Sequence, residues 1–220
     1  DTLAYAIAVE EISRVWGSLG IIVAAHTSLG CGPLMIAGTD AQKERWLRPL
    51  ASGEVIGAYG LTEPGAGSDA GGTRTTARRE DGPDGGAWVI DGGKRFITNA
   101  GQAGTYIITA KTGETAKGDA EISAFIVPAD TIGFSVGRLE DKMGLHASAT
   151  GELIFEGCRI PAENLLGKQG EGFKTFLKVL DGGRISIAAM ALGLAQGAYE
   201  AAAAYSKERE QFGRPIGTFQ

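Results

Sequence analysis

The chain has 220 residues, of which 43% are apolar and 21% charged, and its net charge is −5. This composition is typical of a globular chain that can bury a core, and the length allows one large domain or parts of two or three. Because no stripe of basic residues is present to neutralise phosphates, the acidic balance argues against nucleic-acid binding. The 35 glycines exceed the usual share of about 7% and mark turns and close backbone approaches.

The cysteines and histidines are isolated in the sequence. Cys31 and Cys158 lie in no CxxC or Cys/His spacing, so we expect buried free thiols and no metal site. The apolar stretch 19–29 is short and contains His26, so we expect no membrane span. The sequence starts at Asp1 without a methionine and stops just after what looks like a new element, so we expect a fragment at both ends.

Residues 1–54 are expected to form a helical N-terminal domain. Apolar side chains recur at intervals of three and four in residues 1–16, which predicts a first helix. Residues 19–30 are mostly apolar and predict a buried helix that ends near Gly30 and Gly32.

A further short helix is expected at residues 40–47. Thr39 or Asp40 provides a side-chain oxygen that can cap its first turn. Pro49 is expected to follow the end of this helix, because proline cannot continue a helix from within.

Residues 55–167 are expected to form a central β domain. Residues 87–99 predict a hairpin whose tight turn is Asp91-Gly92-Gly93. Strands separated by glycine and proline predict an antiparallel barrel or sandwich. The other strands are expected at residues 106–111, 122–127, 134–136 and 152–156.

Residues 168–220 return to a helical period, so the fold class is α+β with several domains. Gly182 and Gly183 interrupt this period, and they predict either a kink or a close approach of another element. The alanine-rich run 188–204 suits helices that pack closely, including across a subunit interface.

The loop 62–69 follows a short apolar strand and is the first candidate for a binding site. Gly65 and Gly67 lack a Cβ, so their backbone N–H groups can approach an anion. Thr62 and Ser68 add hydroxyl groups. The loop therefore predicts part of a site for a phosphorylated cofactor, with an exposed turn that binds nothing as the alternative.

A dinucleotide-binding glycine motif is a second alternative for this loop. That motif requires a helix to open inside it, whereas here Pro64 precedes the first glycine. The segment 71–77 contains a Gly-Gly pair and a threonine cluster, which favours a turn and then a strand.

Ordered motifs across nearly the whole chain resemble the acyl-CoA dehydrogenases. They are Tyr59 to Asp69, Lys94 to Asn99, Lys142 to Leu145, Gly170 to Phe173, the pair Asp181 and Arg184, and Glu208 to Ile216. The resemblance implies a helical N-terminal domain, a central β domain and a C-terminal helical bundle of which only the beginning is present. It also implies non-covalent FAD and a homotetramer or dimer with the cofactor near a subunit interface.

The resemblance assigns roles to individual residues. Tyr59, Leu61, Thr62, Gly67 and Ser68 would line the flavin ring and pyrophosphate, and Phe96, Ile97 and Thr98 would pack on the ring. Arg209, Gln211 and Phe212 would reach the FAD of a neighbouring subunit, and Asp181, Arg184 and Ser68 would contact the acyl-CoA.

Each assignment has an ordinary alternative. In these alternatives Arg209 is a solvated residue at a helix end, Phe96 is a core residue, and Asp181 and Arg184 form a surface ion pair. His146 and Gly151 depart from the residues that are usual in the family, and we expect His146 to be a surface residue.

The reaction implied by the resemblance is FAD-dependent α,β-dehydrogenation of an acyl-CoA to the trans-2-enoyl-CoA, with electrons passed to an electron-transfer flavoprotein. A carboxylate with a raised pKa is needed to remove the α-proton. No acid here matches the family's glutamate, which is expected beyond Gln220. The alternatives are a flavin- or acyl-CoA-binding protein without turnover, and an oxidase or flavin monooxygenase of the same fold. The Ala- and Gly-rich composition favours the bacterial cytoplasm over a mitochondrial matrix.

Overall fold

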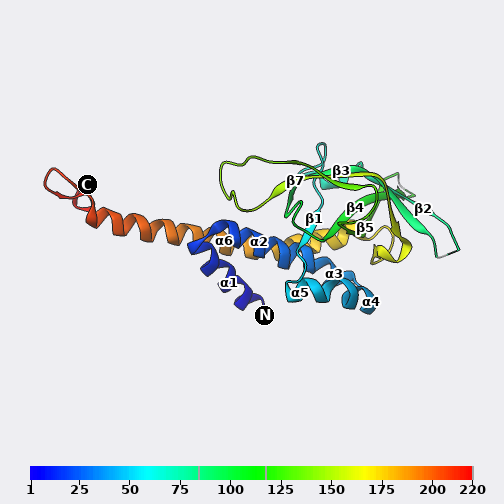
Figure 1. The fold of residues 1–220 in the computed structure, drawn as a ribbon, viewed down its shortest axis with the longest axis horizontal. Helices are drawn as coiled ribbons and strands as arrows, with labels where there is room; N and C mark the ends of the chain where they lie inside the picture. Colours follow the sequence, from blue (N-terminus) through cyan, green and yellow to red (C-terminus); the bar gives the residue numbers. More distant parts are fainter. Residues whose placement is uncertain (84, 117, 220) are drawn as a thin grey trace.

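A computed structural model describes residues 1–83, 85–116 and 118–219 of the chain. It has the three parts expected from the sequence, which are a group of N-terminal helices, a β-sheet domain, and one long C-terminal helix that runs past both (Figure 1). The helices of the first part lie against one side of the sheet domain. The α+β prediction is therefore confirmed.

The first helix forms where the helical spacing predicted it. Helix α1 covers Thr2–Val15, and the Asp1 carboxylate accepts a hydrogen bond from the Leu3 N–H at 2.9 Å. This bond satisfies one of the N–H groups that a helix start leaves without a partner.

One buried side chain of α1 has an unmet hydrogen bond, and this leads to a stability prediction. Among the described residues, the buried Ser13 hydroxyl has no hydrogen-bond partner. Ser13→Ala is therefore expected to stabilise the protein by about 1 kcal/mol, measured by urea unfolding. Ser186→Ala is the control, because the buried Ser186 hydroxyl donates to the Gly183 carbonyl at 2.9 Å. A Ser13→Ala variant no more stable than Ser186→Ala would contradict this expectation.

The second helical run is longer than the sequence predicted. It consists of α2 (Gly17–Ala24), a π-helical segment (Ala25–Cys31) and α3 (Gly32–Ala37), so the expected end near Gly30 and Gly32 is wrong. Gly30 serves packing instead. A Cβ on Gly30 would lie 3.0 Å from the Gly57 Cα, which is tighter than most real Cβ contacts.

The run Gly17–Ala37 is also long and apolar enough, by length and composition, to cross a membrane, which the sequence analysis did not expect. Its polar contacts are those of a core helix. His26 Nδ1 accepts from the Gly57 N–H at 3.0 Å, so its ring proton is on Nε2, which donates to the Leu50 carbonyl at 3.0 Å. Leu34 is fully buried against the sheet domain.

The third helical run also continues beyond its predicted end. Thr39 and Gln42 form a reciprocal capping box at its start. Pro49 was expected after the helix, but it lies inside the run, as the second residue of α5, which directly follows the π-helical segment. The run consists of α4 (Asp40–Gln42), a π-helical segment (Lys43–Leu47) and α5 (Arg48–Ser52).

The β domain is an eight-stranded sheet with strand order β6-β7-β3-β2-β4-β5-β8, and β1 pairs with β4. Most pairs are antiparallel, but β4 pairs in parallel with both β1 and β2. The strands are β1 (Gly57–Gly60), β2 (Thr76–Glu80), β3 (Ala87–Thr98), β4 (Thr105–Glu114), β5 (Ala120–Pro128), β6 (Phe134–Leu139), β7 (Thr150–Pro161) and β8 (Leu165–Leu166).

The predicted hairpin at residues 87–99 is wrong. Strand β3 runs straight through Asp91, Gly92 and Gly93, with an irregularity in its pairing to β7 between Ile90 and Gly92. Gly92 has φ 139°, and a Cβ there would lie 2.7 Å from the Thr75 Cα. The glycine therefore allows a bulge and a close strand, where the sequence motif had predicted a turn.

Two buried clusters hold the fold together. One fills the sheet domain around Trp88, Tyr106 and Phe125. The other joins the sheet to the helices, and in it the ring of Tyr59 stacks on Phe176 with centroids 4.1 Å apart. This second cluster fixes the end of β1 relative to the long C-terminal helix.

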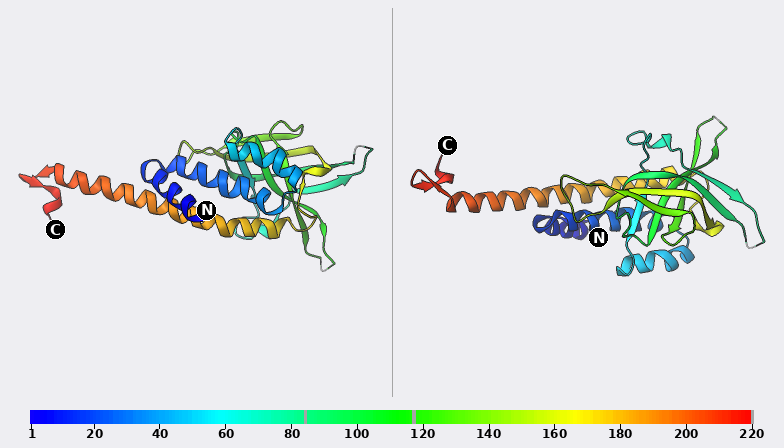
Figure 2. Two further views of the ribbon diagram at one scale, coloured as in Figure 1. Left: turned by 90° about the horizontal axis from the view of Figure 1, so that it is seen from below. Right: turned by 45° about the horizontal axis from the view of Figure 1, so that its top comes forward.

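Helix α6 (Gly172–Glu208) is unbroken over 37 residues, so the kink considered at Gly182 and Gly183 is absent. It packs on the sheet domain and on α1 to α3 as far as Glu200, which pairs with Arg14 of α1, and its last turns project away from the rest of the chain (Figures 1 and 2). The projecting end carries a small hairpin of β9 (Glu210–Gln211) and β10 (Arg214–Pro215).

Candidate functional site

A cavity of about 190 Å³ opens where β1 ends and β3 bulges. Tyr59, Leu61 and Thr62 come from the end of β1 and the loop after it, and Phe96, Ile97 and Thr98 come from the end of β3. Thus, residues that the sequence analysis assigned to a flavin from two separate motifs line one cavity. The remaining lining residues are Ala25, Leu29 and Leu180.

Phe96 lies at this cavity because the strand changes conformation beside it. The pairing of β3 with β7 shifts register between Lys94 and Ile97, and Phe96 has φ 57°. This left-handed conformation costs a non-glycine residue about 1–2 kcal/mol. Phe96 is 60% exposed, so the alternative of a core residue is wrong. An exposed aromatic held in a costly conformation beside a cavity is typical of a binding site.

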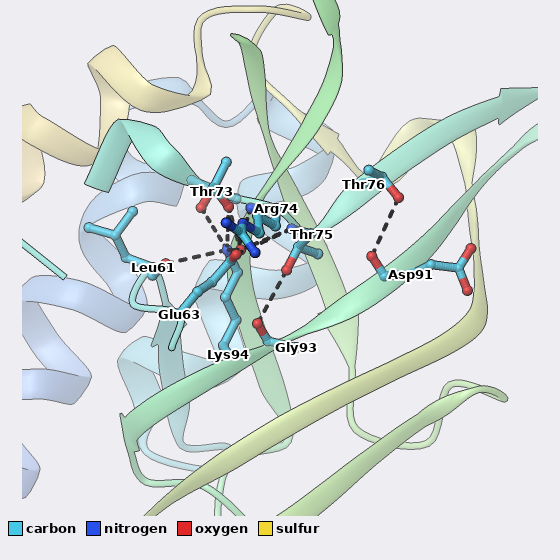
Figure 3. A network of polar contacts seen from close by, with 10 residues as sticks. Leu61, Glu63, Thr73, Arg74, Thr75, Thr76, Asp91, Gly93 and Lys94 are labelled. Atoms are coloured by element: carbon cyan, nitrogen blue, oxygen red, sulfur yellow. Dashed lines mark hydrogen bonds and ion pairs between the residues drawn. The ribbon is translucent and has the colours of Figure 1, made fainter. Parts of the chain in front are cut away.

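A buried ion pair lies directly beneath the loop and the bulge (Figure 3). Lys94 Nζ lies 2.7 Å from Glu63 Oε1, and their side chains are 0% and 5% exposed. Burial alone would raise the pKa of Glu63, but the charge and hydrogen bonds of Lys94 lower it to about 2. Burial lowers the pKa of Lys94 to about 8, against the opposing effect of Glu63. Both groups are therefore charged at neutral pH.

A second, apolar cavity of about 480 Å³ adjoins the first. It lies between the helical run 17–37 and α6, and its walls include Ile21, Ile187 and Ala191. The two cavities share lining residues from three elements, which are Ala25, Leu29, Thr98 and Leu180. No acidic side chain lines either cavity in the described part of the chain.

Asp181 and Arg184 form the surface ion pair that was the alternative to a substrate role. Arg184 Nη1 lies 2.8 Å from Asp181 Oδ1, and the side chains of Arg184 and Asp181 are 74% and 78% exposed. Such a pair contributes at most about 0.5 kcal/mol to stability. Arg184 nevertheless also lines the apolar cavity, whereas Asp181 does not.

The other predicted residues lie outside both cavities. Gly67 and Ser68 are exposed in the loop, and His146 is exposed as expected. Arg209, Gln211 and Phe212 lie at the projecting end of α6 and are exposed. The helix from Arg184 to Glu208 measures about 36 Å at 1.5 Å per residue. Within one chain, therefore, these three residues do not meet the cavity at Phe96.

Several residues that build the site had no role in the predictions from the sequence. Lys94 entered the predictions only as part of its motif. It lies an even number of residues after Trp88 and Ile90 along β3, on the strand face whose side chains point inward. This alternation of side chains along a strand was the signal from which its burial could have been predicted. Leu29 and Leu180 were read as ordinary helix residues, and no pattern in the sequence marks them as cavity walls.

Comparisons with known proteins match the whole length of the chain. Profiles of the acyl-CoA dehydrogenase N-terminal, middle and C-terminal domains match residues 1–54, 58–158 and 170–220. The short-chain specific acyl-CoA dehydrogenase of Clostridium acetobutylicum is 53% identical over 220 residues, which are 100% of this chain and 57% of that protein. The chain thus spans little more than half the length of this relative.

Solved structures agree with these matches. Butyryl-CoA dehydrogenase from Megasphaera elsdenii is 48% identical, with a TM-score of 0.94 over 100% of this chain and 56% of that chain. A structure described as the electron transferring flavoprotein of Acidaminococcus fermentans contains a chain that is 51% identical, with a TM-score of 0.93 over 100% of this chain and 57% of that one. An acyl-CoA dehydrogenase complexed with FAD from Bacillus anthracis is 40% identical, with a TM-score of 0.91 over 100% and 37%.

All three regions of the fold are matched in order, and identities near 50% extend over the full length of the chain. The chain belongs to the acyl-CoA dehydrogenase family.

Proposed function

We propose that the intact protein is an FAD-dependent acyl-CoA dehydrogenase, which oxidises an acyl-CoA to the trans-2-enoyl-CoA and passes the electrons to an electron-transfer flavoprotein. One observation carries this proposal. The cavity at Phe96 and the apolar cavity share Ala25, Leu29, Thr98 and Leu180. A ring bound in the first and an acyl chain in the second would therefore be neighbours at Thr98.

The residues at the cavity suit a flavin. In the described part of the chain, the hydroxyl groups of Thr62 and Thr98 make no hydrogen bond, so both are available to a ligand with ring nitrogens and carbonyls. Tyr59, Phe96 and Ile97 provide apolar and aromatic surface for a planar ring. FAD, when bound there, supplies the acceptor for the hydride that leaves the substrate. The acyl-CoA dehydrogenase of Bacillus anthracis was solved with FAD, which supports the same cofactor here.

The base that removes the α-proton is expected from a part of the protein beyond residue 220. Glu63 is the nearest acid to the cavity in the sequence motif, but its pKa is lowered to about 2 by Lys94, against the effect of burial. A general base for this reaction needs a pKa raised toward neutrality. The role of Glu63 is therefore structural. Asp181 forms an ion pair with Arg184 at the surface.

The distant position of Arg209, Gln211 and Phe212 supports an oligomer. If these residues contact FAD, the cofactor belongs to a second copy of the chain, so we propose a homodimer or homotetramer with FAD near the interface. We propose the bacterial cytoplasm as the location, because the composition is rich in Ala and Gly.

Arg209→Ala is expected to weaken FAD binding by about 10- to 100-fold, because a phosphate would lose a charged hydrogen-bond partner. The dissociation constant is measured by flavin fluorescence on the full-length oligomer. Lys207→Ala is the matched control, since it removes a cation from the last turn of the same helix. An Arg209→Ala protein with the affinity of the control would remove the reason for assigning Arg209 to the cofactor.

The proposed reaction is tested on the full-length protein with a series of acyl-CoA thioesters of increasing chain length. Anaerobic mixing is expected to bleach the flavin absorbance and yield the enoyl-CoA, with the electron-transfer flavoprotein restoring the colour. Protein that takes up no FAD, or that forms no enoyl-CoA from any thioester, would contradict the proposal. Rapid reoxidation of the reduced flavin by O₂ would identify an oxidase instead.

A further inference from the structure

The two segments that form one wall of the Phe96 cavity are tied together beneath it. One segment is the loop 61–66, and the other is the bulge of β3 at residues 95–96. Lys94 Nζ donates to the Leu61 carbonyl at 3.3 Å, and the Arg95 N–H donates to the Thr62 carbonyl at 2.8 Å. The loop closes on itself through paired hydrogen bonds between Glu63 and Ala66, at 3.0 and 3.1 Å.

The ion pair also anchors this wall to the sheet (Figure 3). The Glu63 carboxylate accepts hydrogen bonds from the N–H groups of Arg74, at 2.6 Å, and of Thr75, at 3.2 and 3.3 Å. Lys94 Nζ donates to Thr109 Oγ1 on β4 at 3.2 Å. The Thr73 hydroxyl contacts both charged groups. Two side chains thus connect the loop, the approach to β2, and the strands β3 and β4.

The conformation of Phe96 depends on what holds the chain on either side of it. The pairing between β3 and β7 has no register partner for Arg95 or Phe96, so the ladder does not fix this stretch. A phenylalanine avoids the left-handed region in which Phe96 lies. The residue that precedes the bulge and points into the core is Lys94, and its ammonium group is held by Glu63.

We propose that the Glu63–Lys94 ion pair is the positioning device of the cofactor cavity, which holds the loop 61–66 and the Phe96 bulge in the geometry that receives the flavin. This inference rests on the proposed use of FAD. Neither residue lines the cavity at Phe96. Both are therefore positioning residues that act through Leu61, Thr62 and Phe96.

A purely structural role is the competing explanation, and physical chemistry makes the two separable. A buried ion pair is not in general more stabilising than apolar residues of similar size, because both charges lose their hydration. Removing one partner leaves an uncompensated buried charge, whereas removing both relieves it. Stability and cavity geometry are therefore expected to respond differently to the double replacement.

The experiment compares the full-length wild type with Lys94→Met and with Glu63→Gln/Lys94→Met. The single variant is expected to lose stability, and the double variant to recover most of that loss in urea unfolding. The dissociation constant for FAD is expected to rise about tenfold or more in both variants, because methionine cannot donate to Leu61 or Thr109. Hydrogen exchange is expected to increase at residues 61–66 and 95–97 in both.

Ile160→Ala is the control for general destabilisation. Ile160 is buried beside Trp88 at the opposite end of β3, so its truncation weakens the same domain away from the cavity. Its dissociation constant for FAD is expected to stay within about twofold of the wild type at temperatures where it is folded. Thr109→Val is a milder variant that removes one acceptor of Lys94, and we expect it to raise the constant by about threefold.

The outcomes separate the inference from the function on which it rests. Wild-type affinity and flavin circular dichroism in the double variant and in Thr109→Val would overturn the positioning role and leave the dehydrogenase proposal standing. If the double variant does not fold, Thr109→Val decides alone, by its affinity and its exchange at residues 61–66. A wild-type protein that binds no FAD would overturn both proposals.

Discussion

Gly193→Ala is expected to destabilise the protein by about 2 kcal/mol, although alanine is the better helix former. A Cβ at position 193 would lie 2.1 Å from the Glu10 carbonyl oxygen and 3.0 Å from the Arg14 N–H nitrogen, so α1 and α6 cross with their backbones in contact. Because backbone atoms cannot rotate away, the helices must separate, at a cost of about 3 kcal/mol. The helix propensity of alanine offsets about 1 kcal/mol of this.

The same helix provides the matched control. Gly182 has open space where its Cβ would be, so Gly182→Ala is expected to stabilise the protein by about 0.5–1 kcal/mol. Both variants make the same chemical change, and urea unfolding of the full-length protein measures both. If Gly193→Ala proved as stable as Gly182→Ala, the close crossing of α1 and α6 would be wrong.

Acid is expected to destabilise the protein through Glu63. The pKa of this carboxyl is about 2 in the folded protein, where Lys94 lowers it against the effect of burial, and the ordinary value is 4.5. Between these two values the unfolded chain binds more protons than the folded one, so stability falls as the pH falls. The contribution of Glu63 is complete above pH 4.5, and about 2 kcal/mol of it is lost by about pH 3.

The measurement is urea unfolding of the wild type and of Glu63→Gln at pH 6 and pH 3. The glutamine cannot ionise, so the stability gap between the two proteins is expected to narrow by about 2 kcal/mol at the lower pH. Glu80→Gln is the comparison at the surface, where Arg78 and Arg159 also lower the pKa of the carboxyl, so its gap is expected to narrow in the same direction but by less than that of Glu63→Gln. A gap that stays constant for Glu63→Gln would show that folding does not lower the pKa of the Glu63 carboxyl.

The sequence determined the main elements and the motifs of this protein. Helical spacing predicted α1, and apolar runs predicted β4, β5 and β7, because these signals depend only on residues a few positions apart. The order of the motifs identified the family, which the comparisons then supported over the full chain. The threonine cluster after Gly72 correctly predicted a strand, because β2 begins at Thr76 within this cluster.

The tertiary structure decided how the glycines and prolines are used. The sequence predicted a helix end near Gly30 and Gly32, a turn at Gly92 and Gly93, and Pro49 after a helix end. Each lies instead inside a continuous element. Glycine, which has no Cβ, suits both a turn and a close contact between segments. Only the neighbouring segment in the fold, such as Thr75 beside Gly92, shows which of the two uses applies.

The candidate site divides in the same way. The family resemblance assigned Tyr59, Thr62, Phe96 and Thr98 to a cofactor site, and the fold brings them to one cavity. The buried position of Lys94 under the loop, 31 residues from Glu63 in sequence, follows from strand pairing over long separations. The bulge that turns Phe96 outward also depends on β7, which lies more than 50 residues further along the chain. Contacts at such separations are set by the packing of the whole domain, and no local pattern of residues encodes them.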